Sequence, residues 1–447
     1  ANISCGTISK NITLVEHIST TSTCFTIDAN DFTLDGNGFN ITNTESANNG
    51  VYNLQFDDVT VKNFGGINNF VESIEFDSTA TDGFILNNTI TNATSTAIGS
   101  DGARTTVANN TVSSGEASNG ILIWGTSGAL ITENVFNLTE GVASIAIRLG
   151  GGGDLSKDAT ITNNVITGNS SSALVSLESG SYRMDFRNNE ITRTDGSDYL
   201  LVLNDDEGHL ENNTFTGTFN SGFPSKPCVY LLGNPGDHNF TNNTINCNND
   251  ALLLGTTVEQ SNIENNIMTS INNENIDDDS GADDINELMI NNTYGKITWN
   301  SSDLSHAQNL SVGTNIFLEN NNIGFYSIAS SQKLNSTAEI EIYGLAYSET
   351  PELHKDGIRC DALDTCNVSY DSGKGILFAN VSSFSNYTTI QSNSAPTVST
   401  ITFNESIIYT NFDLTASSNY TDPDNNSGTL FFEWYVDNVN VYNESVA

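Results

Sequence analysis

The sequence predicts an all-β protein in which most of the chain forms a parallel β-helix of roughly 12 coils. A six-residue pattern recurs nine times at spacings of 22 to 30 residues, and two or three short β-like segments fall within each unit. No unit contains a run of about 10 residues with helical periodicity. Repeats of this period without helices indicate a solenoid that stacks one β coil per unit.

The recurring pattern is an apolar residue, any residue, two Asn, any residue and a second apolar residue; Glu133 replaces the first Asn in one copy. Asn tolerates the left-handed conformation that a sharp corner requires. Stacked coils place each Asn above the last, so we expect the side-chain amides to form a hydrogen-bonded ladder. The second Asn of the pair is present in every copy, at Asn88, Asn110, Asn134, Asn164, Asn189, Asn213, Asn243, Asn266 and Asn292.

The composition is strongly acidic, with 54 Asp and Glu against 14 Lys and Arg and a formal net charge of −40. Binding to nucleic acid or to an anionic lipid surface needs clustered cations, so neither partner is expected. No apolar run approaches the roughly 18 residues that a membrane helix needs, which predicts no direct membrane insertion.

Six cysteines fall into three local pairs, and an even count in local pairs favours disulfides formed in an oxidising compartment. The chain begins Ala1-Asn2-Ile3, which is typical of a secreted protein after removal of a signal peptide. We therefore predict an extracellular or cell-surface location. The predicted pairs are Cys5 with Cys24, Cys228 with Cys247, and Cys360 with Cys366.

The pattern divides the chain into three regions. Residues 1–298 carry the repeat and are assigned to the β-helix. Residues 299–394 show ordinary strand alternation and are assigned to a β-rich C-terminal cap. Residues 395–447 follow a Ser-, Asn- and Pro-containing linker and include a central Trp434 on an alternating strand, which favours an immunoglobulin-like sandwich. Such a domain needs about 100 residues, so we expect it to be incomplete here.

Several segments carry a family resemblance: 5–8, 24–27, 32–38, 334–340, 356–360, 380–388, 420–424 and 434–436. The first three and those between 334 and 388 resemble secreted archaeal surface proteins with pectin-lyase-like right-handed parallel β-helix repeats. The last two are similar to tandem immunoglobulin-like repeats of archaeal surface proteins. The resemblance implies a right-handed helix and a long, glycosylated, multi-domain protein of the surface-layer or appendage type.

One acidic turn is the best local candidate for catalysis. Residues 204–209 contain Asp205, Asp206, Glu207 and His209, and β-helix polysaccharide lyases and hydrolases need paired carboxylates or calcium carboxylates with a basic residue. No neighbouring unit places an Arg or Lys in register with this turn. A solvated acidic turn is therefore the preferred interpretation, and no catalytic residue is assigned.

A second acidic segment suggests calcium, because hard oxygen ligands in a flexible loop suit Ca²⁺. The alternative is an acidic, salt-adapted surface loop. The candidate ligands are Asp277, Asp278, Asp279, Asp283 and Asp284. The resemblance extends to copper-maturation β-helix proteins, but the five His are dispersed and only three Met occur, so copper is not expected.

Asn-x-Ser/Thr sequons are frequent, and N-linked glycans are expected in a secreted protein. The candidate acceptors outside the Asn pairs are Asn2, Asn11, Asn92, Asn137, Asn169, Asn300, Asn309, Asn335, Asn367, Asn380, Asn386, Asn404 and Asn419.

These observations predict a non-enzymatic structural component of an archaeal cell surface. Copies of the chain would assemble into a layer, filament or appendage through the β-helix and the immunoglobulin-like modules, with calcium and glycans assisting. One alternative is an adhesin that binds glycans or other cells through exposed aromatics such as Trp124 and Tyr199. A second alternative is a polysaccharide lyase or hydrolase.

Overall fold

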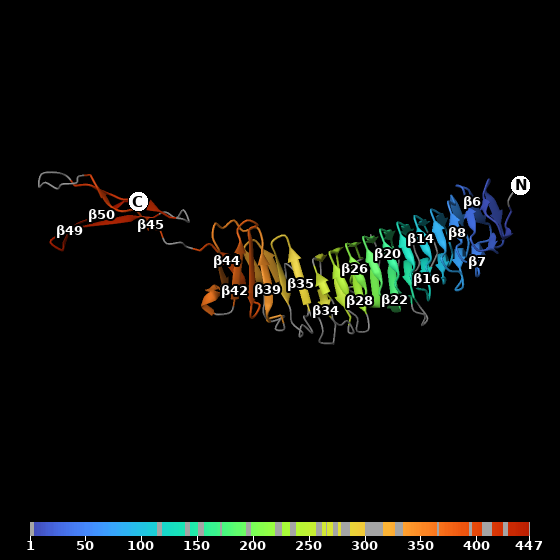
Figure 1. The fold of residues 1–447 in the computed structure, drawn as a ribbon. Coiled ribbons are helices and arrows are strands. Elements are labelled where there is room, and N and C mark those ends of the chain that lie inside the picture. The colour runs from blue at the N-terminus through green and yellow to red at the C-terminus, as the bar shows by residue number, and fades with distance from the viewer. Residues whose placement is uncertain are drawn as a thin grey trace.

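The structure is a computed structural model. It describes residues 4–113, 119–138, 144–150, 156–169, 172–193, 198–219, 226–232, 238–255, 262–264, 266–270, 276–278, 287–299, 316–326, 334–363, 366–392, 396–404, 414–422 and 428–446. Figure 1 shows an elongated solenoid that begins at the N-terminus and is followed by smaller antiparallel sheets and a tail of strands. The predicted all-β parallel solenoid with a β-rich C-terminal part is confirmed.

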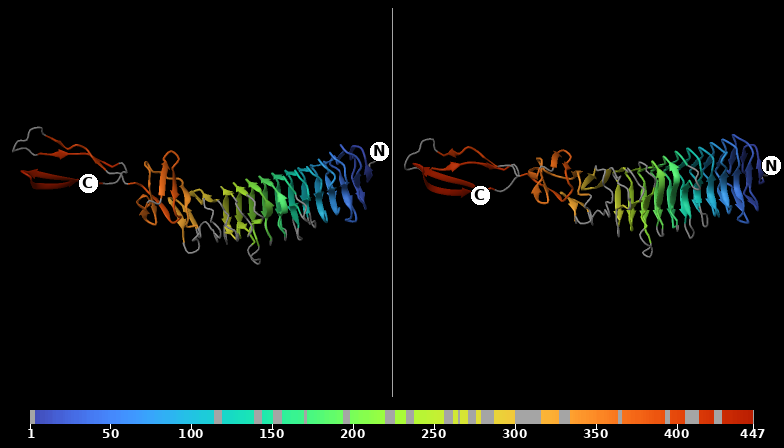
Figure 2. Two further views of the ribbon diagram at one scale, coloured as in Figure 1. Left: turned by 60° about the horizontal axis from the view of Figure 1, so that its bottom comes forward. Right: turned by 90° about the horizontal axis from the view of Figure 1, so that it is seen from below.

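Three parallel sheets run along the solenoid (Figure 2). Each coil contributes one strand to each sheet, except that the last coil contributes strands only to sheets A and B within the described residues. Sheet A comprises β1 (Gly6–Ile8), β4 (Phe25–Ile27), β7 (Asn49–Asn53), β10 (Glu72–Phe76), β13 (Thr96–Ser100), β16 (Asn119–Ile123), β19 (Ile145–Leu149), β22 (Val175–Tyr182), β25 (Leu201–Asp206), β28 (Val229–Leu232), β31 (Leu252–Leu254) and β34 (Ile276–Asp278). Sheet B comprises β2 (Ile12–Thr13), β5 (Thr33–Asp35), β8 (Thr60–Lys62), β11 (Phe84–Leu86), β14 (Thr106–Ala108), β17 (Leu130–Thr132), β20 (Thr160–Thr162), β23 (Asp185–Arg187), β26 (His209–Glu211), β29 (Asn239–Thr241), β32 (Asn262–Glu264) and β35 (Glu287–Asn292). Sheet C comprises β3 (Ile18–Thr20), β6 (Asn40–Asn43), β9 (Gly66–Asn68), β12 (Thr89–Thr91), β15 (Thr111–Ser113), β18 (Val135–Leu138), β21 (Val165–Gly168), β24 (Glu190–Arg193), β27 (Thr214–Gly217), β30 (Thr244–Cys247) and β33 (Ile267–Ser270).

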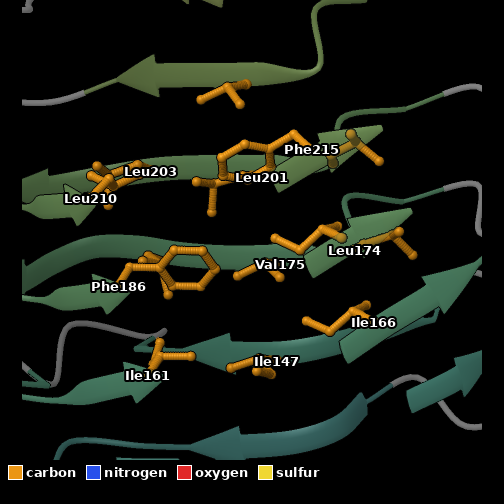
Figure 3. Close-up of a cluster of buried hydrophobic side chains, with 14 of the residues drawn as sticks. Ile147, Ile161, Ile166, Leu174, Val175, Phe186, Leu201, Leu203, Leu210 and Phe215 are labelled. Atoms are coloured by element: carbon orange, nitrogen blue, oxygen red, sulfur yellow. The ribbon is translucent and has the colours of Figure 1, made fainter. Parts of the chain in front are cut away.

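The core is a set of apolar columns that run parallel to the solenoid axis. Side chains alternate between the two faces of each short strand, so the inward residue of one coil lies directly on that of the next. In sheet B one column passes through Ile161, Phe186 and Leu210, all at most 1% exposed. Figure 3 shows these columns, with the Phe186 and Phe215 rings 6.4 Å apart in a stacked arrangement. The register is fixed because a slip of one residue would turn each column toward solvent.

The Asn pairs form the corner between sheets B and C. The first residue of the pair adopts positive φ, at 55° in Asn87 and 57° in Asn109, and Glu133 does the same at 56°. The second residue points inward and is buried. Asn110 donates from its backbone N–H and from Nδ2 to Oδ1 of Asn134, at 2.9 and 3.0 Å. The same double contact links successive coils from Asn88 to Asn266, at Asn88, Asn110, Asn134, Asn164, Asn189, Asn213, Asn243 and Asn266.

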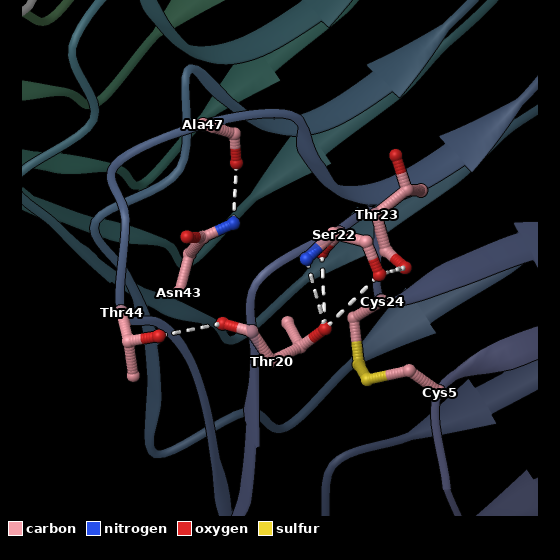
Figure 4. The surroundings of a disulfide bond; sticks show 8 residues. All are labelled: Cys5, Thr20, Ser22, Thr23, Cys24, Asn43, Thr44 and Ala47. Atoms are coloured by element: carbon pink, nitrogen blue, oxygen red, sulfur yellow. Dashed lines mark hydrogen bonds between the residues drawn. A yellow bond between two sulfur atoms is a disulfide. The ribbon is translucent and has the colours of Figure 1, made fainter.

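The three predicted disulfides, Cys5–Cys24, Cys228–Cys247 and Cys360–Cys366, are present. Cys5–Cys24 joins the beginning of the first coil to the second, and Thr20 and Ser22 hydrogen-bond beside it (Figure 4). An end coil has one unpaired strand edge, and a covalent tie to the next coil holds that edge in place.

The solenoid ends where sheet B changes from parallel to antiparallel pairing. β35 pairs parallel with β32 and antiparallel with β36, so the sheet continues without a break. Its added strands, in order, are β36 (Gly295–Trp299), β39 (Ala338–Ile342), β43 (Ile376–Val381) and β42 (Cys366–Asp371), and we call this part the cap sheet. A five-stranded sheet packs on it through the aromatic cluster of Trp299, Phe325 and Phe384, with ring centroids 4.6 to 5.1 Å apart.

The second sheet of the cap has the order β37 (Ile316–Glu319), β38 (Asn322–Phe325), β44 (Tyr387–Ile390), β40 (Glu352–Lys355) and β41 (Ile358–Arg359), and a 3₁₀ turn, η2, spans Asp361–Leu363. The tail contains β45 (Thr397–Val398), β46 (Thr402–Phe403), β47 (Ala416–Ser417), β48 (Tyr420–Thr421), β49 (Leu430–Val436) and β50 (Val439–Val446). These six strands form three two-stranded pairs among the described residues. The immunoglobulin-like assignment of the tail stays a prediction.

Candidate active site on the outer face of sheet A

Four acidic residues meet on the outer face of sheet A, between β7 and β16 of Figure 1. Glu72 and Glu75 lie on β10 and point outward, while Ile74 and Phe76 of the same strand are buried. Asp77 directly follows β10, and Asp101 directly follows β13 on the next coil. Because β10 and β13 are paired in register, Asp77 and Asp101 lie side by side. We call these four residues the acid cluster.

A glycine makes room for the central carboxyl group of this cluster. Glu75 is paired with Gly99 on the neighbouring strand. In the described register, the outward row runs through Tyr52, Glu75, Gly99 and Leu122, and of these four residues only Gly99 has no side chain. A Cβ added to Gly99 would lie 1.9 Å from Oε2 of Glu75. The carboxyl group of Glu75 therefore lies over the backbone of the neighbouring strand instead of extending into solvent.

This position keeps Glu75 protonated at neutral pH. Burial, followed by the charges of Glu72, Asp101 and Asp77, raises the pKa of Glu75 from 4.5 to about 8. A carboxyl group whose neighbours are ionised carboxylates resists losing its own proton. A protonated acid beside ionised carboxylates is the arrangement used for paired general acid and base catalysis.

Asp77 and Glu72 accept hydrogen bonds from neutral donors. Tyr52 donates to Oδ2 of Asp77 at 3.2 Å, and the backbone N–H of Ser78 donates to Oδ1 at 2.6 Å. Burial and the nearby Asp77 carboxylate raise the pKa of Tyr52, so it keeps the proton that it donates. Asn49 donates from Nδ2 to Oε2 of Glu72 at 3.0 Å.

Aromatic side chains lie on the same face of sheet A. Trp124 directly follows β16 and is the counterpart of Asp101 one coil further on, since Ser100 pairs with Ile123. Further along, Tyr230 of β28 stacks on Tyr199 at 5.1 Å, and the Lys226 ammonium lies 4.4 Å from the Tyr199 ring. Trp124, Tyr199 and Tyr230 are all half-buried, so each ring keeps an accessible part.

The acidic turn that the sequence singled out lies elsewhere. Asp205 and Asp206 end β25 in sheet A, but His209 begins β26 in sheet B, on a different face of the solenoid. There His209 lies 3.5 Å from Asp185 and 3.8 Å from Glu211. The turn therefore does not bring its acids and its histidine together on one face, and it does not belong to the acid cluster.

The predicted calcium ligands are only partly placed. Asp277 and Asp278 lie on β34, and nothing is described of their side chains, while Asp279, Asp283 and Asp284 lie outside the described residues. Within the part of the chain that the structure describes, no group of three or more His, Cys, Asp or Glu is arranged to hold a metal ion. The calcium assignment stays a prediction.

Sequence inspection missed the acid cluster although a signal was present. Glu72, Glu75 and Asp77 fall within six residues, and Asp101 follows Asp77 by 24 residues, which is within the repeat spacing. Applying the period of the Asn pairs to the acidic residues would have placed Asp101 beside Asp77. The signal runs along one column of coils and not along one turn of the chain.

No helix among the described residues is both long and apolar enough to span a membrane. Residues 119–293 match the family model described as right handed beta helix region, which confirms the right-handed parallel solenoid over that stretch. A search of the curated proteins gave no match.

Two groups of solved structures are similar in fold. The tailspike protein of E. coli bacteriophage HK620 in complex with a pentasaccharide is 9% identical, with a TM-score of 0.32, over 86% of this chain and 82% of that chain. The catalytic domain of a GH87 alpha-1,3-glucanase in complex with nigerose is 11% identical, with a TM-score of 0.25, over 63% of each chain.

These comparisons contradict two predictions. The protein was expected to be a structural component of an archaeal surface layer or filament and to have no enzymatic activity. The similar structures are instead a sugar-bound tailspike and the catalytic domain of a glucanase, so both predictions are withdrawn. At such identities and TM-scores the likeness extends to the fold alone, and any substrate of this chain has to be argued from its own residues.

Proposed function

We propose that the protein is an extracellular polysaccharide hydrolase whose active site is the acid cluster of sheet A. The observation that carries the proposal is Glu75, a carboxyl group with its pKa raised to about 8 beside three other carboxyl groups on an accessible sheet face. Three disulfides support an extracellular location, because such bonds persist in oxidising compartments.

In this proposal Glu75 is the general acid. It transfers its proton to the glycosidic oxygen as the bond from that oxygen to the anomeric carbon breaks, and the leaving sugar departs as an alcohol. A water molecule attacks the anomeric carbon, and a carboxylate removes the proton of that water. Each cycle consumes one water, and the proton taken up by the base restores Glu75 through solvent.

We assign the role of base to Asp101, which directly follows β13 on the coil next to that of Glu75. Asp101 is the diagonal neighbour of Glu75 across the parallel pair β10 and β13, and it is close enough for its charge to raise the pKa of Glu75. A carboxylate that activates a water, instead of attacking the sugar itself, gives inversion at the anomeric carbon.

The charge of the protein selects against anionic substrates. The acid cluster repels uronic acids and sulfated sugars, and the net charge of −40 adds long-range repulsion. Trp124 offers a half-buried ring beside Asp101 on which the apolar face of a sugar can stack. The expected substrate is therefore a neutral polysaccharide that lies along sheet A.

The test is turnover of a panel of neutral polysaccharides by the unmodified protein and by Glu75→Gln. The substitution keeps the size of the side chain and removes the transferable proton, so we expect the rate to fall by a factor of about 100 or more. Glu190→Gln is the matched control, because Glu190 is exposed on sheet C. Proton NMR of the first product should show the inverted anomer.

A binding role without turnover is the second candidate, and the aromatic residues of the same face favour it. If the unmodified protein binds a neutral glycan, does not cleave it, and loses binding on Trp124→Ala, the adhesin alternative is correct and the catalytic assignment is wrong. Equal turnover by Glu75→Gln and the unmodified protein would also overturn the assignment of Glu75. Failure of every glycan to bind or react would remove both candidates.

A further inference from the structure

A shallow groove lies on the outer face of the cap sheet, across β39, β43 and β42; β39 and β42 are labelled in Figure 1. Its volume is about 260 Å³. The strands alternate, so Leu377 and Ala379 are buried beneath it while Phe378 and Asn380 point into it. Pockets for drug-sized ligands span about 300 to 1,000 Å³, so this groove is suited to a smaller ligand.

The register places an aromatic ring among polar groups. Phe378 lies between Glu341 on β39 and Ser369 on β42. One step along the strands, Asn380 lies between Glu339 and Asn367. Phe378 is 38% exposed. Exposing apolar surface to water is unfavourable, so a ligand that stacks on the ring would gain free energy by covering it.

The charge of the groove is partly compensated. Glu341 forms an ion pair with Lys296 and accepts a hydrogen bond from the Tyr343 hydroxyl at 3.0 Å. Burial and the Glu341 carboxylate raise the pKa of Tyr343, so the hydroxyl stays a donor. Glu339 is exposed at the groove and adds an acceptor. The lining thus offers two amides, the Ser369 hydroxyl and the carboxylates of Glu339 and Glu341 around one ring.

We infer that this groove binds a neutral hexopyranose or N-acetylhexosamine ring, with the apolar face of the sugar on Phe378. The amides of Asn367 and Asn380 and the hydroxyl of Ser369 hydrogen-bond the sugar hydroxyls, and Glu339 accepts from them. The carboxylates exclude anionic ligands. This inference concerns the cap sheet and does not depend on the proposed hydrolysis at sheet A.

The sugar has two sources with the same chemistry. It belongs either to a free glycan or to a glycan attached to this chain, because Asn380-Val381-Ser382 and Asn367-Val368-Ser369 are both sequons. Residues two apart on a strand share a face, so the first sugar on Asn380 could reach the ring of Phe378.

The first arm uses protein produced in a host without N-glycosylation. Calorimetry with neutral hexasaccharides should show saturable binding that Phe378→Ala weakens about tenfold, since stacking on an aromatic ring contributes of this order. Tyr326→Ala is the control, because Tyr326 is an exposed aromatic residue of the cap that lies outside the groove and donates a hydrogen bond to Glu319. Repeating the titration in Glu75→Gln/Trp124→Ala separates the groove from sheet A: binding that persists there belongs to the cap even if the proposed hydrolysis fails.

The second arm uses protein from a glycosylating host. A glycan mass on Asn380 that Ser382→Ala abolishes identifies the attached source, and Ser382 itself is exposed and outside the groove. Enzymatic removal of that glycan should then lower the unfolding temperature in the unmodified protein and not in Phe378→Ala. The inference is overturned if neither arm shows a Phe378-dependent effect, or if Lys-rich peptides bind at Phe378 in place of sugars.

Discussion

The substitution Gly99→Ala tests the physical basis of the acid cluster. The φ angle of Gly99 is not in the left-handed region, so alanine fits the backbone. The new Cβ would lie 1.9 Å from Oε2 of Glu75, and the flexible side chain of Glu75 is what it meets. We therefore expect the strand to stay in place and the Glu75 carboxyl group to move out into solvent, where its pKa returns toward the usual value of 4.5.

The magnitude follows from the pKa of Glu75. The folded protein keeps a proton up to about pH 8 that the unfolded chain releases near pH 4.5. Because the folded state binds more protons in this window, its free energy of unfolding falls as pH rises, by about 1.4 kcal/mol per unit. The fall amounts to at most about 3 kcal/mol at pH 7 and about 4 kcal/mol at pH 8. Gly99→Ala should abolish it.

The assay is urea unfolding at pH 5, 6.5 and 8, with hydrogen exchange of the β10 and β13 amides as a local measure. The unmodified protein should lose stability across this range relative to Gly99→Ala, and Glu75→Gln should resemble the alanine variant in having no such dependence. Gly99→Ala should also lose turnover, because the carboxyl group has left its place. Parallel pH curves for all three proteins would refute the reasoning.

Two further substitutions test the frame that holds the site. Asn134→Ala removes the acceptor of two hydrogen bonds and should lower the free energy of unfolding by about 2 to 4 kcal/mol in urea titrations. The control is Asn137→Ala, at an exposed residue of the same coil, which should change the free energy of unfolding by less than about 0.5 kcal/mol. Replacing Cys228 and Cys247 by Ser opens a link of sequence separation 19 and should cost about 2 to 5 kcal/mol, measured by thermal unfolding; an unchanged melting temperature would show that the link is not stabilising.

The fold could be predicted from the sequence because its determinants are local and repeated. The Asn pairs occupy a corner where positive φ is required at the first position, and this requirement recurs in coil after coil at Asn87, Asn109 and Asn163. A period that repeats nine times is visible in a single sequence. The three disulfides could also be predicted from the sequence, because each joins cysteines that are close in the chain.

The candidate site could not be predicted in the same way, because it occurs once. Glu72 and Glu75 resemble the solvated acids that are common along this chain, and only the stacking of coils brings Asp101 to them. The perturbed pKa of Glu75 depends on the lack of a side chain at Gly99, which is a property of the neighbouring coil. An acidic turn with a histidine, residues 204–209, attracted attention instead because its residues are adjacent in sequence.

Exposure helps to separate functional from structural residues among those that break the pattern of their column. Arg193 is one such residue, because it is a cation in an inward column of sheet C, where it is paired with Gly168 and Gly217. Burial lowers its pKa to about 10, but it is fully covered and donates to the carbonyl oxygen of Ser172, so it can serve only the fold. Glu75 also has a strongly shifted pKa, but it lies on the outer face and is half-buried, not fully covered. A titratable group on the outer face that has a shifted pKa and is not fully covered, next to a glycine in its row, is therefore the feature to search for along the columns.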